Sequence, residues 1–310
     1  MKRHLAISTS LFLVVVALAG CGKSAKPASP LGMSAGGNNG ATASDVAEVK
    51  QVIASNPAYV NEGEYTTGTE ASMTLGAGGM SIMRPIRWWR TIDSTERVVD
   101  IEYGDLDSLG HPRAAVATVH KHFTGTLNIL AGDTASTDTA RRVVHKPLDD
   151  DWTRKLAFHR FRIDSTGKGR WHLVGTSGVT VTSRLATTQI LSIRIQAGAK
   201  DTLITDPLQL HRLRRILWIP DDTPVTVTVR TGRPDDIVVL YHRLERRPFK
   251  SNGDNTCTAI FMDPDFPGLR HFGVNAFSRG TLWDDIAPYD SEAWVVPFAV
   301  RDRDCDVDRD

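Results

Sequence analysis

Two histidines separated by one residue could bind a metal. His120 and His122 lie in a long alternating run, so both side chains point to one face of a predicted strand. Neutral imidazoles suit zinc and copper, and His159 and His172 on two further predicted strands are candidates for the remaining ligands. The alternative is a solvated or ligand-facing sheet surface, because the apolar residues of this run take the opposite parity.

A small basic cluster follows in the second half of the chain. Arg212, Arg214 and Arg215 could meet an anionic glycan or a phospholipid headgroup, since guanidinium groups match phosphate and carboxylate oxygens. The alternative is a solvated surface, because Asp221 and Asp222 lie close by in the sequence.

The motifs of common enzyme classes are missing. Gly175-Thr-Ser177-Gly178 departs from the Gly-x-Ser-x-Gly pattern of serine hydrolases, and no His-Glu-x-x-His, phosphate-binding loop or dinucleotide fingerprint occurs. The sequence therefore predicts no cofactor and favours a protein that is not an enzyme. Paired carboxylates for glycoside hydrolysis stay open, because their spacing is a three-dimensional property.

The start of the chain predicts export and a lipid anchor. Lys2 and Arg3 precede an apolar run that is too short to span a membrane, which is typical of a signal peptide over residues 1–20. Leu18-Ala19-Gly20-Cys21 resembles the lipobox of bacterial lipoproteins. The resemblance implies that Cys21 receives a diacylglyceryl group, is then N-acylated with a chain such as palmitate, and begins the mature protein. The alternative is an ordinary secretory signal followed by a chance cysteine.

The same resemblance places the protein in the cell envelope. Gly22, rather than an aspartate, follows the acylated cysteine, which implies the outer membrane if the cell has one. The buried acyl chains would hold the protein firmly on the bilayer.

The other two cysteines predict a disulfide. Cys257 and Cys305 form an even pair in an oxidising compartment. A bridge closing a loop of roughly 50 residues would contribute about 4 kcal/mol of stability in the chain-entropy model. The alternative is two separate thiols.

The charge balance argues against nucleic acid as a partner. The chain has 37 Lys and Arg against 36 Asp and Glu, and removal of Lys2 and Arg3 with the signal peptide leaves the mature chain at −1. A nucleic-acid surface usually needs a concentrated basic excess.

The first part of the mature chain predicts a tether and an α+β domain. Residues 21–44 are rich in Gly, Ser, Ala and Asn, which is typical of a flexible linker with a reach of about 25–30 Å. Ser44 then resembles an N-cap, and Val46, Val49 and Ile53 share one helical face. Within the predicted domain, 45–188, the expected strands cover residues 86–92, 98–103, 113–130, 155–163 and 170–182. One helix followed by a curved antiparallel sheet resembles the cystatin-like or nuclear-transport-factor-like folds, which often hold a small-ligand cavity and as often serve as plain interaction modules.

Residues 189–310 predict a second domain. Seven short alternating strands, with turn signals between them, suggest an immunoglobulin-like β-sandwich. The expected strands cover residues 190–195, 208–210, 225–229, 237–242, 257–261, 271–275 and 293–300. The Cys–Trp–Cys arrangement of antibody domains is missing. The fold class expected for the whole chain is mainly β.

Together these patterns favour a membrane-anchored envelope lipoprotein with a binding or architectural role. Its expected partners are membrane lipid, through acylated Cys21, and an envelope protein or a glycan. The alternative is an envelope enzyme or a metal-dependent small-ligand-binding protein that uses a cavity in the first domain.

Overall fold

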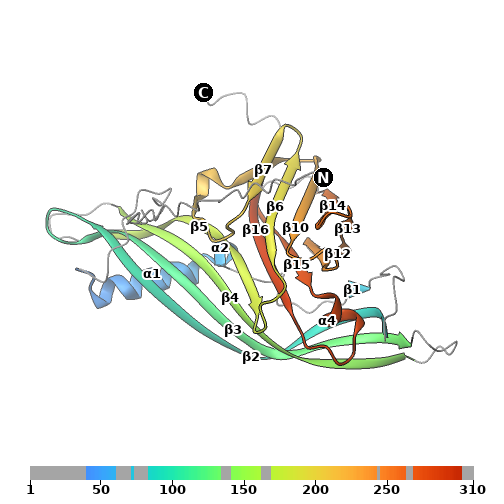
Figure 1. Ribbon diagram of the computed structural model, residues 1–310. Helices are drawn as coiled ribbons and strands as arrows, with labels where there is room; N and C mark the ends of the chain where they lie inside the picture. Colours follow the sequence, from blue (N-terminus) through green and yellow to red (C-terminus); the bar gives the residue numbers. More distant parts are fainter. Residues whose placement is uncertain are drawn as a thin grey trace, which may run out of the picture.

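A computed structural model gives the fold and describes residues 40–60, 71–72, 83–133, 141–161, 169–242, 245–262 and 268–301. The protein is mainly β, as expected, with mostly antiparallel sheets and one long helix in these ranges (Figure 1). The predicted signal peptide, Cys21 and Cys305 lie outside them. No helix among the described residues is both long and apolar enough to cross a bilayer.

The larger sheet has eleven strands. Their order is β1-β2-β3-β4-β5-β16-β15-β11-β12, with β8 paired to β5 and β9 paired to β16. The bounds are β1 (Ala71–Ser72), β2 (Met83–Leu106), β3 (Pro112–Asp133), β4 (Arg141–Phe161), β5 (Arg170–Ser183), β8 (His211–Arg212), β9 (Leu217–Pro220), β11 (Ile237–His242), β12 (Glu245–Pro248), β15 (Gly268–Phe277) and β16 (Ser291–Arg301).

The smaller sheet has five strands, in the order β13-β14-β10-β6-β7. Their bounds are β6 (Ile190–Ala197), β7 (Lys200–Ile204), β10 (Pro224–Thr231), β13 (Lys250–Ser251) and β14 (Thr256–Met262). The helices are α1 (Ala43–Ser55), α2 (Pro57–Val60) and α4 (Arg279–Trp283), and η1 (Leu213–Arg215) is a single 3-10 turn.

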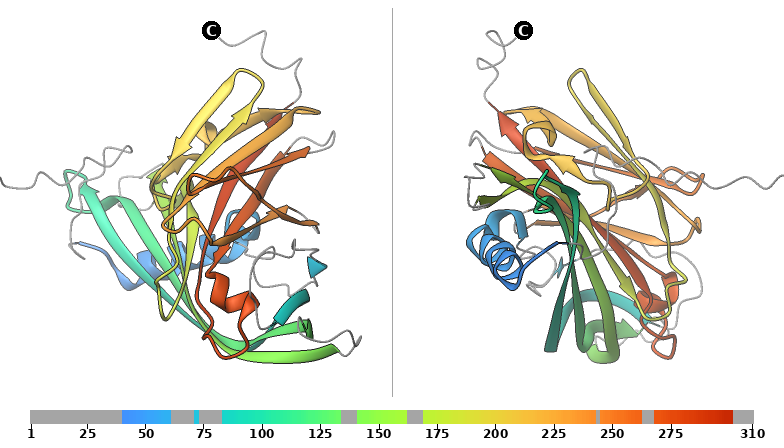
Figure 2. Two further views of the ribbon diagram at one scale, coloured as in Figure 1. Left: turned by 45° about the vertical axis from the view of Figure 1, so that its right-hand side comes forward. Right: turned by 90° about the vertical axis from the view of Figure 1, so that its left-hand side faces the viewer.

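The first three long strands bend strongly along their length (Figures 1 and 2). Bulges in β2 lie between Pro85 and Arg87 and between Ile92 and Ser94, and a bulge bends the strand that carries it. The start of β2 therefore reaches the far part of the same sheet, where the Trp88 ring lies 4.9 Å from that of Phe277. The expected strands 86–92 and 98–103 are in fact one strand, because the second bulge shifts the alternation between them.

Three strands of the larger sheet contribute to two hydrophobic cores. On β11, Val238 and Leu240 pack toward the smaller sheet, whereas Val239 and Tyr241 pack toward the curved strands β2–β5. β15 and β16 divide their side chains in the same way. The two sheets thus form a β-sandwich, and the curved strands cover the other face of its central layer.

Buried charges on β4 hold this arrangement together. Lys146, Asp150 and Arg154 follow one another at every fourth position and all point into the fold, where Asp150 and Arg154 are 0% exposed. The Arg154 guanidinium donates to the Tyr59 carbonyl at 2.5 Å, and the Tyr289 hydroxyl donates to Asp150 at 3.0 Å. Burying charges is costly unless they are paired, so each fixes its partner segment against β4.

Lys146 binds the segment that contains α4. Its ammonium group donates to the carbonyls of Gly280, Asp284 and Ala287 at 3.0, 2.6 and 2.6 Å. Burial lowers the pKa of Lys146 to about 8, with Asp284 and Asp285 opposing, so the side chain is still charged at pH 7.

Helix α1 forms as expected but starts earlier. Thr42, not Ser44, is the N-cap, because Asp45 stands three residues later and completes a capping box with it. Val49 and Ile53 are buried as predicted. Asp45 also accepts a hydrogen bond from the Trp171 indole at 3.1 Å, which fixes α1 to β5.

The predicted domain boundary falls in the connector between β5 and β6. Because β16 pairs with β5, one sheet contains strands from both predicted domains. The expected strand at 208–210 is not formed, since these residues belong to a turn and the loop after it.

Candidate functional site

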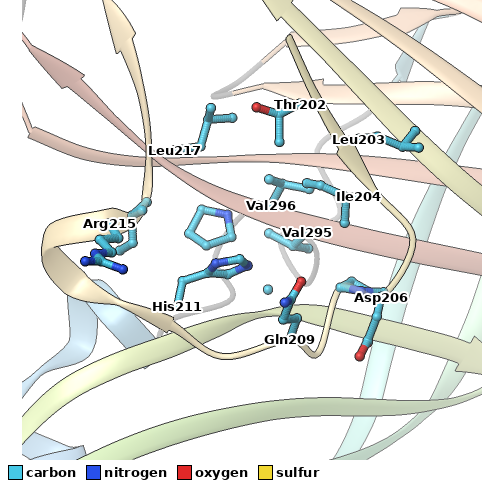
Figure 3. Close-up of a pocket in the computed structure, with 14 residues that line it drawn as sticks. Thr202, Leu203, Ile204, Asp206, Gln209, His211, Arg215, Leu217, Val295 and Val296 are labelled. Atoms are coloured by element: carbon cyan, nitrogen blue, oxygen red, sulfur yellow. The ribbon is translucent and has the colours of Figure 1, made fainter. Parts of the chain in front are cut away.

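A pocket opens on the larger sheet where β5 and β9 both lie beside β16. It has a volume of about 200 Å³. Its lining comes from β5, β7, the turn after β7, the β8–η1 segment, β9 and β16 (Figure 3). Apolar side chains make up most of the walls, and they are Leu203, Ile204, Pro207, Ile216, Leu217, Val295, Val296 and Pro297.

The pocket exists because β16 changes partners. Its antiparallel pairing with β5 ends at Val295, opposite Val179, and its parallel pairing with β9 begins at Phe298, opposite Leu217. The intervening Val296 and Pro297 have no partner on that edge among the described strands. Proline has no backbone N–H, so its position in the gap leaves no donor unpaired.

Gly178 forms part of the pocket wall. A β-carbon at this position would lie 2.5 Å from the Val295 carbonyl oxygen and 2.9 Å from the Pro207 carbonyl oxygen, so two backbones approach here closer than any side chain would allow. The neighbouring Ser177 is buried and donates to the Gly178 carbonyl at 2.6 Å. The Ser177 hydroxyl therefore binds a backbone carbonyl and is not available to the pocket as a nucleophile.

The rim of the pocket is polar. Figure 3 shows Arg215 and Asp206 on opposite sides, with His211 and Gln209 between them. Asp206 accepts a hydrogen bond from the backbone of Leu208 at 2.8 Å. Partial burial lowers the pKa of His211, and the negative charge of Asp206 opposes this shift.

One residue of the predicted basic cluster, Arg215, lies at this rim. Arg212 is on β8 and pairs through its backbone with Gly175, while Arg214 and Arg215 are in η1. All three arginines are exposed, and Arg215 lines the pocket. In the described part of the chain, no hydrogen bond or ion pair involves the Arg215 side chain.

The predicted histidine set is divided into two separate pairs. His120 and His122 share the outer face of β3 as expected, but His159 and His172 oppose each other across β4 and β5. On β3, the residue opposite His159 is Ala114, which lies six positions before His120. The pair His120 and His122 is therefore well separated along the sheet from the pair His159 and His172. The described residues contain no group of three or more potential ligands that could hold a metal.

Carboxylates surround His122 instead. Its Nδ1 lies 3.0 Å from Asp151, and its Nε2 lies 3.6 Å from Asp149. The hydrogen bond to Asp151 raises the pKa of His122, and the negative charges of Asp149, Asp151 and Glu96 add to this against partial desolvation. His120 lies 3.2 Å from Thr153 through Nδ1.

Cys257 lies in the core of the sandwich. Its thiol donates to the Val229 carbonyl at 3.7 Å, and burial raises its pKa to about 12, with Asp236 adding to the shift. Such a thiol is inert toward nucleophilic chemistry at neutral pH. Its predicted disulfide partner, Cys305, lies outside the described residues, so the bridge stays a prediction.

Most of the pocket was not predicted from the sequence. Pro297 inside an apolar strand is a signal for a break in the ladder, and Gly178 is one for a close backbone approach. Neither reveals that Leu203 and Leu217 meet at the same place. Comparisons of the chain with protein families, with characterised proteins and with solved structures give no match.

Proposed function

We propose that the protein is a cell-envelope lipoprotein that binds a small, mainly apolar ligand in the pocket beside β16. The observation that carries the proposal is the pocket itself, which has apolar walls, a few polar groups at its rim and a frame of strands. Ligand sites in proteins commonly have this composition. Strands and a buried glycine hold the walls, so the site is largely formed before a ligand arrives.

Membrane attachment through Cys21 is the second half of the proposal. It is supported by the lipobox-like tetrapeptide Leu18-Ala19-Gly20-Cys21 behind an apolar segment. The Gly- and Ser-rich residues between Cys21 and Thr42 would let the folded part stand off the bilayer. In this arrangement the protein is a tethered binding module of the envelope, favoured at the outer membrane if the cell has one.

Finer descriptions of the fold belong to the same proposal. The sandwich formed by β6, β10 and β14 against β11, β15 and β16 is compatible with an immunoglobulin-like module, and the curved strands with α1 are compatible with a cystatin-like one. The rival function, a metal-dependent protein or enzyme built on His120 and His122, has less support because the described residues contain no group of three or more potential ligands that could hold a metal.

Photolabelling tests the pocket. The anchored protein in phosphatidylcholine discs is exposed to an octanol analogue that carries a diazirine, and the labelled residues are located by mass spectrometry. We expect adducts on the pocket walls and their loss in Leu203→Trp, because Leu203 lines the opening and is 62% exposed, so a larger ring there blocks entry without disturbing the core.

The matched control is Leu191→Trp. Leu191 is also an exposed leucine of the smaller sheet, at 45%, but it does not line the pocket. Labelling that is equal in native protein and both variants would refute the site.

A further inference from the structure

We infer that the ligand is a single-chain anionic amphiphile, with its apolar end in the pocket and a carboxylate or phosphate at the rim beside Arg215. This inference rests on the proposed function and specifies its ligand class. Two independent features carry it, namely the size of the pocket and the distribution of charge around its mouth.

The pocket is too small for an entire ligand of ordinary size. Its volume is about 200 Å³, whereas pockets for drug-sized molecules are roughly 300–1,000 Å³. An engineered cavity of about 150 Å³ holds one benzene ring. The pocket therefore accepts a ring or a short stretch of alkyl chain, and the rest of the molecule must extend over the rim.

The rim is where a head group would then lie, and Arg215 is the one arginine or lysine among the residues that line the pocket. The segment His211–Arg215 places three exposed arginines within four residues, and the single carboxylate among the lining residues is Asp206. The Arg215 guanidinium is at the mouth and has no ion-pair partner among the described residues. A guanidinium group can form two parallel hydrogen bonds with a carboxylate or phosphate.

The remaining polar groups fit the same head group. His211 lines the same rim, and its ring can donate a hydrogen bond to the head group. Asp206 uses a carboxylate oxygen to accept the Leu208 N–H at 2.8 Å. Asp206 lies across the opening from Arg215, which leaves the arginine side for an anion (Figure 3).

The test compares two photoreactive probes on the anchored full-length protein in phosphatidylcholine discs. One is the octanol analogue used above, and the other is the matching octanoate analogue. We expect the carboxylate to label the pocket at a concentration up to about fivefold lower than the alcohol needs, as an ion pair with the exposed Arg215 would give. Arg215→Gln should abolish that advantage, so that the two probes label the pocket at similar concentrations.

Controls separate a local contact from a general charge effect. Arg97→Gln removes an exposed arginine from β2, three strands away from β5, and should not change either probe. Raising the salt concentration should weaken octanoate but not octanol labelling. Unlabelled octanoate should compete with the octanoate probe for the pocket, whereas octylamine should not.

Each other outcome has a distinct meaning. Equal labelling by both probes, unaffected by Arg215→Gln, overturns the anionic head group and leaves the proposed function intact. Failure of both probes to label the pocket overturns the inference together with the proposed function. If phosphatidylglycerol discs bind the rim of the protein while neither probe enters the pocket, the ligand is a bilayer surface and the inference is wrong.

Discussion

Asp236 is partly buried at a position that disfavours its ionised carboxylate. Both of its oxygens are buried and lack a hydrogen-bond partner of normal geometry among the described residues. Burial raises the pKa of Asp236 to about 6, Arg233 opposes this, and the negative charges of Asp235 and Asp290 add to it. The ionised form is therefore disfavoured in the fold relative to the unfolded chain.

The pH dependence of Asp236→Asn follows from this shift. Since the folded pKa of about 6 lies above the unfolded value of 3.8, Asp236 lowers the stability of the native protein as pH rises from about 4 to 6, and the loss persists at pH 7. We expect Asp236→Asn to raise the free energy of unfolding by about 1–2 kcal/mol at pH 7, after allowance for partial exposure, and by nearly nothing at pH 4.

Denaturant titrations at the two pH values measure this difference. Asp235→Asn is the matched control, because Asp235 is adjacent but exposed, and its effect should stay within about 0.5 kcal/mol. A gain for Asp236→Asn that is the same at pH 4 and pH 7 would show that the carboxylate is not the cause.

Asp290, close to Asp236, has the opposite character. Burial raises its pKa, but hydrogen bonds from the side chains and backbones of Thr187 and Thr188 outweigh burial and lower it overall. Ser183 donates to the same carboxylate at 3.3 Å. Two nearby aspartates thus differ because Asp290 accepts several hydrogen bonds that outweigh burial, whereas Arg233 does not outweigh the burial of Asp236. No property of the residue type could predict this difference.

At the scale of elements, β4 explains most of what could not be predicted from the sequence. Residues 141–154 gave no strand signal, because Lys146, Asp150 and Arg154 occupy inward positions where alternation requires apolar residues. From residue 155 onward the inward positions are apolar, and that part of the strand was predicted correctly. Buried charges are tolerated here because distant segments provide their partners.

Lys146→Met tests the role of these charges. The substitution keeps the length of the side chain but leaves the carbonyls of Gly280, Asp284 and Ala287 without their donor. We expect a loss of about 2–3 kcal/mol in the free energy of unfolding and faster hydrogen exchange in residues 279–289.

Lys155→Met on the same strand provides the comparison. Lys155 takes the opposite parity and is partly exposed, so its loss should change stability by less than about 0.5 kcal/mol. Unchanged exchange around α4 in Lys146→Met would mean that packing alone holds this segment.

The strands with regular alternation were predicted well. Val119, Phe123 and the histidines between them fall on the expected faces of β3, because most residues on one face of that strand are apolar and buried. The second bulge in β2 has no comparable signal in the sequence. A one-residue shift in the alternation of apolar and polar residues resembles the end of one strand and the start of another.

At the scale of the whole molecule, the pocket depends on contacts between distant parts of the chain. Gly178, Leu203, Leu217 and Pro297 come from four strands of both sheets, and their meeting follows from β16 pairing first with β5 and then with β9. Local patterns predict strands but not which strands become neighbours. The sequence therefore favoured a division at residue 188, although strands from both sides of that position pair in the larger sheet.

The protein is proposed to combine a lipid anchor at Cys21 with a ligand pocket in its folded part. The most direct test is intact-mass and fragmentation analysis of the mature protein, purified from the membrane fraction after labelling with the octanol analogue. The account predicts a chain that begins at acylated Cys21 and carries one probe, placed by fragmentation within residues 202–217 or 295–297. A water-soluble chain that still begins at Met1, or a probe located mainly outside those residues, would contradict it.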